Sequence, residues 1–126
     1  MPIITSTILA DFLTACLLKV GEKIGEKTIE TIFDRKRELS EGFAGLFKQE
    51  ISTLGLSGTA TLEEVQKQLE AKPEVVGQAL EKLNNNPKLL ADLNEQLKQM
   101  SGITINAKNI AAAGNVSINN QTNKFS

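Results

Sequence analysis

Carboxylates are the side chains of this sequence with the clearest capacity for acid–base chemistry, because paired carboxylates can donate and accept a proton. Glu63 and Glu64 are adjacent, and further acids recur every four residues at Glu22, Glu26, Glu30 and Asp34. Residues four apart lie along one line of a helix, and a basic line lies beside the acids at Lys19, Lys23 and Lys27. Two interpretations stay open for these charges: a solvated helix face, or an assembly surface that meets another copy.

Several residue types that many enzymes use are absent from the sequence. It has no His, the usual proton shuttle near neutral pH, and it lacks the His and Cys set of a zinc site. Cys16 is the only cysteine, and its apolar neighbours indicate a small buried hydrophobic residue in a reducing compartment. The balance of 14 basic and 15 acidic side chains argues against nucleic acid as the main partner. We therefore expect no enzymatic activity, no cofactor and no metal.

Hydrophobic periodicity predicts that residues 1–100 form an all-α domain, a helical bundle of four to six helices. The first helical region extends from Pro2 to about Arg37, with a kink or flexible joint near Gly21 and Gly25. A second amphipathic pattern covers residues 39–54.

Helix start and stop signals mark the second half of this domain. Thr61 to Glu64 matches a capping box, and Pro73 separates the helix that follows from the next one. Asn86 and Pro87 predict the N-cap and first residue of the last helix, which Ser101 and Gly102 should end.

The N-terminal run from Ile3 to Leu18 is apolar except for a few hydroxyl residues and Asp11, its only charge. No basic segment precedes it and no small-residue cleavage site follows, so we expect it in the mature cytoplasmic protein. The run is slightly short for a transmembrane helix and carries an acid in its middle. Its candidate membrane-insertion residues are Ile3, Ile4, Ile8, Leu9, Asp11, Phe12, Leu13, Leu17 and Leu18.

The sequence changes character in residues 101–126, which we predict to be a separate segment. The helical period disappears, and Ile103-Thr-Ile-Asn106 is repeated as Val116-Ser-Ile-Asn119 after a spacing of 13 residues. Two short strands joined by an arc cannot stand alone in water, but copies stacked in register pair every backbone group and align Ile and Asn side chains. A disordered polar tail or a linker remains the alternative, although a linker has no reason to carry repeated β-branched pairs.

The resulting prediction is a C-terminal β-arc that assembles into amyloid. The residues of its expected core are Ile103, Ile105, Asn106, Gly114, Asn115, Val116, Ile118, Asn119 and Gln121.

The segment Gly114-Asn-Val-Ser-Ile-Asn-Asn-Gln121 resembles the bacterial amyloid signalling motifs, which are similar to the RIP homotypic interaction motif and to fungal prion-signalling motifs. Asn119 stands where Gly is usual, which leaves the subfamily open. The helical region before the motif, with its apolar N-terminal run, resembles the bacterial Bell domains and the fungal HeLo and HET-S domains.

This resemblance implies regulated cell death in bacteria. A receptor of the nucleotide-binding NLR type with a matching motif would template the tail into amyloid, and the crowded helical domains would then act on the lipid of the inner membrane. The expected partners are thus other copies of the chain, the receptor and lipid, with the protein cytoplasmic at rest and at the inner membrane on activation. Two other interpretations remain: a non-lethal adaptor that recruits a partner through its helical domain, and a structural fibre protein.

Overall fold

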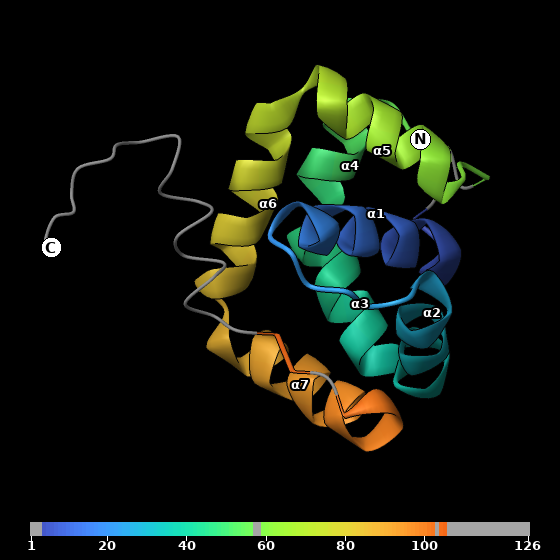
Figure 1. Ribbon diagram of the computed structural model, residues 1–126, viewed down its shortest axis with the longest axis vertical. Helices are drawn as coiled ribbons and strands as arrows, with labels where there is room; N and C mark the ends of the chain where they lie inside the picture. The colour runs from blue at the N-terminus through green and yellow to red at the C-terminus, as the bar shows by residue number, and fades with distance from the viewer. Residues whose placement is uncertain (1–3, 57–58, 103, 106–126) are drawn as a thin grey trace, which may run out of the picture.

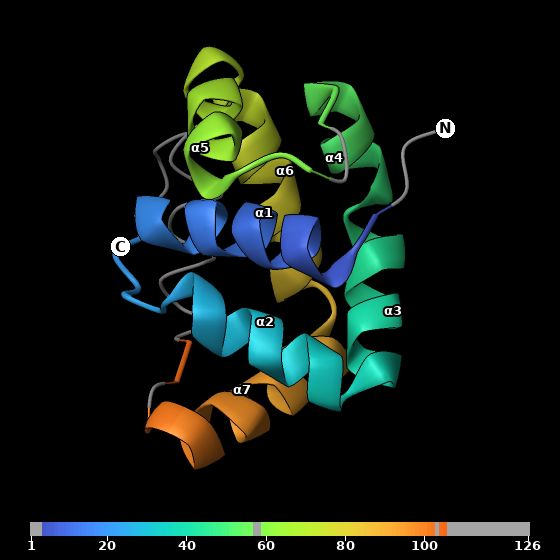
Figure 2. The ribbon, with the colours of Figure 1, turned by 90° about the vertical axis from the view of Figure 1, so that its right-hand side faces the viewer.

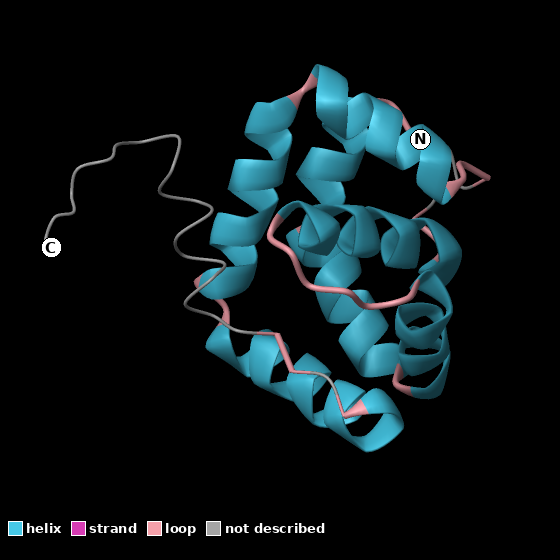
Figure 3. Cartoon of the chain, in the orientation of Figure 1, coloured by secondary structure: helices cyan, strands magenta, loops and turns pink. Residues whose placement is uncertain are grey.

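The computed structural model describes residues 4–56, 59–102 and 104–105 of the chain, and all of its regular structure there is helical (Figure 3). Seven helices follow one another in these residues: α1 (Ser6–Lys19), α2 (Glu26–Arg35), α3 (Arg37–Leu46), α4 (Lys48–Leu54), α5 (Leu62–Ala71), α6 (Pro73–Asn84) and α7 (Pro87–Ser101). The predicted all-α class is confirmed, but the expected number of four to six helices was too low.

The helix ends predicted from the sequence are present. Thr61 and Glu64 form the reciprocal capping box that begins α5, and the Asn86 side chain accepts a hydrogen bond from the Leu89 N–H at the start of α7. Gly102 ends α7 in the left-handed conformation, with a φ of +72° that favours glycine.

The first helical region was predicted too long, because the chain reverses direction at Gly21. This residue has a φ of +91°, and the N–H groups of Gly21 and Glu22 bond back to the carbonyls of Leu18 and Leu17. The pattern is a Schellman motif, which stops a helix sharply. The expected joint is therefore a full break between α1 and α2, and the acidic and basic lines of the sequence do not continue along one helix.

The pattern over residues 39–54 is also divided, into α3 and α4, at Phe47. Its backbone N–H still bonds to the carbonyl of Phe43, and its own carbonyl accepts from Ile51, so the break is a change of direction with little loss of hydrogen bonding. Phe47 itself is neither Gly nor Pro, and the nearby Gly45 lies within α3, so no residue at the break signals it in the sequence.

Helix α1 runs through the middle of the domain, with α2, α3, α5 and α6 packed around it (Figure 1). It packs chiefly against α2 and α5, which lie on either side of it in Figure 2, with further contacts to α3 and α6. Helix α7 lies away from α1 and packs on α2, α3 and α6.

Four phenylalanines tie α1 into this arrangement. The ring of Phe12 from α1 lies 5.3 Å from that of Phe47, which in turn stacks on Phe43 at 5.7 Å between ring centroids. Phe43 continues the chain of rings to Phe33 of α2, also at 5.7 Å. All four rings are buried, and aromatic pairs of this kind add to the free energy gained from apolar burial.

Candidate functional site

The N-terminal helix is buried on every side. Ten consecutive residues, from Ile8 to Leu17, are almost inaccessible to water. A helix that is apolar all round is expected either in a protein core or in a membrane, since no face of it is suited to water. In this structure α1 is a core helix.

The candidate membrane-insertion residues divide by position along this helix. Ile8, Leu9, Asp11, Phe12, Leu13 and Leu17 are buried, and Ile4 is half-buried just before the helix begins. Leu18 is 42% exposed at the end of the helix, and Ile3 lies outside the described residues. Among the described helices, none combines the length and the apolar character needed to cross a bilayer.

Two polar side chains interrupt the apolar surface of α1. Asp11 is 1% exposed and Thr14 is 2% exposed, and neither Asp11 Oδ1 nor Thr14 Oγ1 has a hydrogen-bond partner. A buried polar atom left unsatisfied costs about 1–3 kcal/mol. The core therefore holds α1 less firmly than the same helix with apolar residues at these two positions.

Cys16 is on the same helix and fully buried, as the sequence predicted. Burial in apolar surroundings raises the pKa of its thiol far above the ordinary value, and the negative charge of Glu50 raises it further. The thiolate is the reactive form of cysteine, so Cys16 is chemically inert while α1 stays in the core.

Glu50 is the buried member of a partly buried ion pair, whose other member, Lys82, has a side chain that is 36% exposed. The carboxylate oxygens of Glu50 lie 2.8 Å and 3.0 Å from Lys82 Nζ. Glu50 is 2% exposed, and its negative charge contributes to the raised pKa of the Cys16 thiol. The pair therefore joins α4 to α6, and α6 in turn packs against α1.

The segment after α7 is attached to the helical domain at Ile105. Its side chain is 2% exposed and belongs to the same core cluster as the apolar residues of α1. The Ile105 N–H donates to Asn94 Oδ1 at 2.8 Å, and Asn94 Nδ2 donates to the Ile105 carbonyl at 3.2 Å. One side-chain amide thus occupies both backbone groups of Ile105, as a neighbouring β-strand would.

Ile105 is the only residue of the expected amyloid core among those described. Ile103, Asn106, Gly114, Asn115, Val116, Ile118, Asn119 and Gln121 all lie outside the described residues. Sequence reasoning missed Asn94, the residue that holds Ile105. Its only local signal is weak, since Asn is a poor helix former in the interior of a helix.

The acidic and basic lines of the sequence lie at the surface of the domain. Lys27 pairs with the half-buried Glu30 at 3.9 Å, and Lys19 pairs with Glu70 at 4.0 Å. Both lysines are exposed to solvent, where an ion pair contributes little. Glu63 and Glu64 are exposed in the first turn of α5, where Glu64 serves the capping box. These contacts favour solvated helix faces for the charges they involve.

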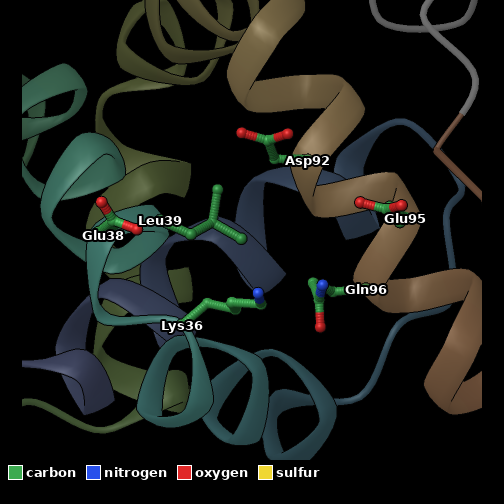
Figure 4. A pocket seen from close by; sticks show the side chains of 6 residues that line it. All are labelled: Lys36, Glu38, Leu39, Asp92, Glu95 and Gln96. Atoms are coloured by element: carbon green, nitrogen blue, oxygen red, sulfur yellow. The ribbon is translucent and has the colours of Figure 1, made fainter.

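A polar groove of about 160 Å³ opens between the α2–α3 junction and α7. Figure 4 shows the carboxylates of Glu38, Asp92 and Glu95 spread around its rim, with Lys36 reaching toward Gln96. Carboxylates that diverge in this way do not form a ligand set, and the described residues contain no group of three side chains suited to a metal ion.

Comparison with known proteins adds no family to this description. No protein-family model matches the chain, and neither the curated proteins nor the solved structures contain a significant match.

Proposed function

We propose that this protein is a non-enzymatic bacterial cell-death effector. An NLR-type receptor with a matching motif templates its tail into amyloid, and the helical domain then disrupts the inner membrane. The observation that carries the proposal is the burial of α1, an apolar helix that ends at a glycine break and forms the centre of the domain. A segment of this kind is suited to both a core and a bilayer.

The energetics of transfer support this mechanism. Burying a large apolar side chain gains about 1.5–3 kcal/mol, and lipid offers α1 much the same gain as the core does. Asp11 would cost about 2.5–3.5 kcal/mol at the centre of a bilayer on insertion scales. It is already buried without a partner for Oδ1, so part of that cost is present before α1 moves.

Asn94 supplies the link between the tail and the core. Because its amide occupies the N–H and the C=O of Ile105, a second tail can stack on Ile105 only after displacing Asn94. Displacement also withdraws the Ile105 side chain from the core cluster that contains α1. Assembly of the tail therefore removes part of the packing that keeps the helical domain closed.

The proposal is tested by seeding the full chain in the presence of vesicles of phosphatidylethanolamine and phosphatidylglycerol. Fibrils grown from a peptide of residues 102–126 should convert the full chain and release a dye trapped in the vesicles. Val116→Asp should prevent both effects, because a charge stacked in every layer of a fibre is strongly unfavourable.

The other outcomes separate the competing functions. Fibres without dye release would favour the adaptor, which recruits a partner through an intact helical domain. A wild-type peptide that stays soluble for days would contradict the amyloid mechanism itself.

A further inference from the structure

Four residues of α1 lie on one narrow face of the helix: Thr7, Asp11, Thr14 and Leu18. They are spaced by four, three and four residues, which keeps all of them within a small arc at 100° per residue. We refer to them as the Asp11 stripe. The remaining residues between Ile8 and Leu17 are apolar, so this stripe holds every hydrogen-bonding side chain in that stretch apart from the weakly polar Cys16.

Three residues of the stripe lack the contacts that their side chains favour. In its middle, Asp11 Oδ1 and Thr14 Oγ1 are buried and lack hydrogen-bond partners. At its end, Leu18 is the large hydrophobic residue that the described part of the chain leaves exposed. The folded domain therefore leaves two polar atoms without hydrogen bonds and one leucine exposed on this face of α1, whereas the apolar residues around the rest of the helix are buried.

The unmatched groups are complementary to one another. A threonine hydroxyl donates a hydrogen bond and a carboxyl oxygen accepts one, so the same face carries a donor and an acceptor within one turn. Two copies of the face can satisfy each other, with Thr14 of one helix donating to Asp11 of the other. Polar groups on an otherwise apolar helix are commonly directed at a neighbouring helix when the surroundings are lipid.

We propose that the Asp11 stripe is the surface through which α1 of one copy binds α1 of a second copy after release from the core. This inference rests on the proposed function, which releases α1 and brings identical chains together through their tails. Stacked tails raise the effective concentration of neighbouring α1 helices, so a modest affinity of the stripe for itself is sufficient.

Disulfide crosslinking of the full chain tests the orientation of the contact. Leu18→Cys in a Cys16→Ala background places a thiol on the stripe, whereas the native Cys16 lies on the opposite face of the same helix. Both proteins are oxidised on vesicles of phosphatidylethanolamine and phosphatidylglycerol, before and after seeding with fibrils of residues 102–126. After seeding, we expect about tenfold more disulfide dimer from Leu18→Cys than from Cys16, because a disulfide requires the two Cβ atoms to face each other.

A second substitution tests the chemistry of the contact. Thr14→Val removes the hydroxyl while preserving the shape of the side chain, and should lower the seeded yield of Leu18→Cys dimer about tenfold without lowering the melting temperature of the resting protein. Thr31→Val is the matched control, because its exposed hydroxyl donates to the Lys27 carbonyl of α2 and should not alter the dimer yield.

Dye release, measured in the same samples, separates the two proposals. Release with equal crosslinking at Cys16 and Leu18→Cys, or with none at either, overturns the stripe and leaves the effector function in place. Crosslinking at Leu18→Cys that Thr14→Val lowers, without release, overturns membrane disruption and supports the stripe, whereas crosslinking that Thr14→Val leaves unchanged overturns the stripe. Absence of both contradicts both proposals.

Discussion

Two segments must move in the proposed mechanism, and the resting protein holds them very differently. Helix α1 is fixed by ten consecutive buried residues, an aromatic contact and the helices around it. Among the residues described after α7, Ile105 is held by its one buried side chain and by the Asn94 amide. With about 1.5–3 kcal/mol for each buried side chain and about 1 kcal/mol for each hydrogen bond, α1 is anchored several times more firmly.

The difference indicates an order of events. In the proposed mechanism the attachment at Ile105 opens first, at low cost, and a template then captures the tail, whereas α1 is released only after the core has lost other contacts. The same comparison separates the substitutions that unfold the domain from those that only loosen the tail.

The largest effect is expected from a charge placed inside the firmly held segment. Leu9→Lys buries an unpaired ammonium in the core and should destabilise the domain by more than about 4 kcal/mol, enough to unfold it. Leu18→Lys changes the same residue type in the same helix at an exposed position, and should alter the stability by less than about 0.5 kcal/mol. Thermal melting followed by circular dichroism compares the two, and equal melting temperatures would contradict the burial of α1.

The second effect concerns the ion pair that joins α4 to α6. Lys82→Met leaves Glu50 buried without its partner and should destabilise the protein by about 3 kcal/mol. Lys27→Met removes an exposed pair and should change the stability by less than about 0.5 kcal/mol. Urea denaturation measures both, and a small effect of Lys82→Met would mean that α4 and α6 are not joined through this pair.

The third effect tests the attachment at Ile105. Asn94→Ala removes both hydrogen bonds to Ile105 and should destabilise this attachment locally by about 1–3 kcal/mol, with little change in the melting temperature. Amide hydrogen exchange at Ile105 should accelerate about tenfold or more, and seeded fibre growth should start earlier. Asn85→Ala alters an exposed residue and is the control. Unchanged exchange at Ile105 would show that Asn94 is not the attachment.

The smallest effect is a pH dependence at Cys16. Its thiol pKa is raised by burial in the folded protein and is about 8.5 in the unfolded chain, so its contribution to stability is complete below pH 8.5 and is lost as the pH rises above it. At about pH 9.5 the loss should reach about 1.4 kcal/mol. Denaturation of the wild type and of Cys16→Ala at pH 7.5 and 9.5 isolates the contribution of the thiol to the free energy of unfolding. An equal change in this free energy between the two pH values in both proteins would contradict a buried thiol.

Local signals in the sequence were sufficient for the helical class and for several helix ends. Thr61 with Glu64, Asn86 with Pro87, and Gly102 each act within one turn of the chain, so their residue types determine the outcome. The reversal at Gly21 was only partly predictable, because glycine permits a positive φ without requiring one.

Contacts between distant residues could not be predicted in the same way. The change of direction at Phe47 depends on its packing with Phe12 and Phe43, and no turn residue marks it. Ile105 sits in a local pattern typical of a strand, yet its backbone groups bond to the Asn94 side chain and its side chain is buried in the helical core. The lack of partners at Asp11 and Thr14 is likewise a property of the folded core and has no counterpart in the sequence.

The coupling between tail assembly and α1 is tested most directly by the reactivity of Cys16 in the full wild-type chain. As the chain's only cysteine, it reports on α1 alone. We expect a maleimide to leave the soluble protein unlabelled and to label Cys16 once fibrils of residues 102–126 have seeded the chain on vesicles. Fibres that form in full while Cys16 stays unlabelled would contradict the account.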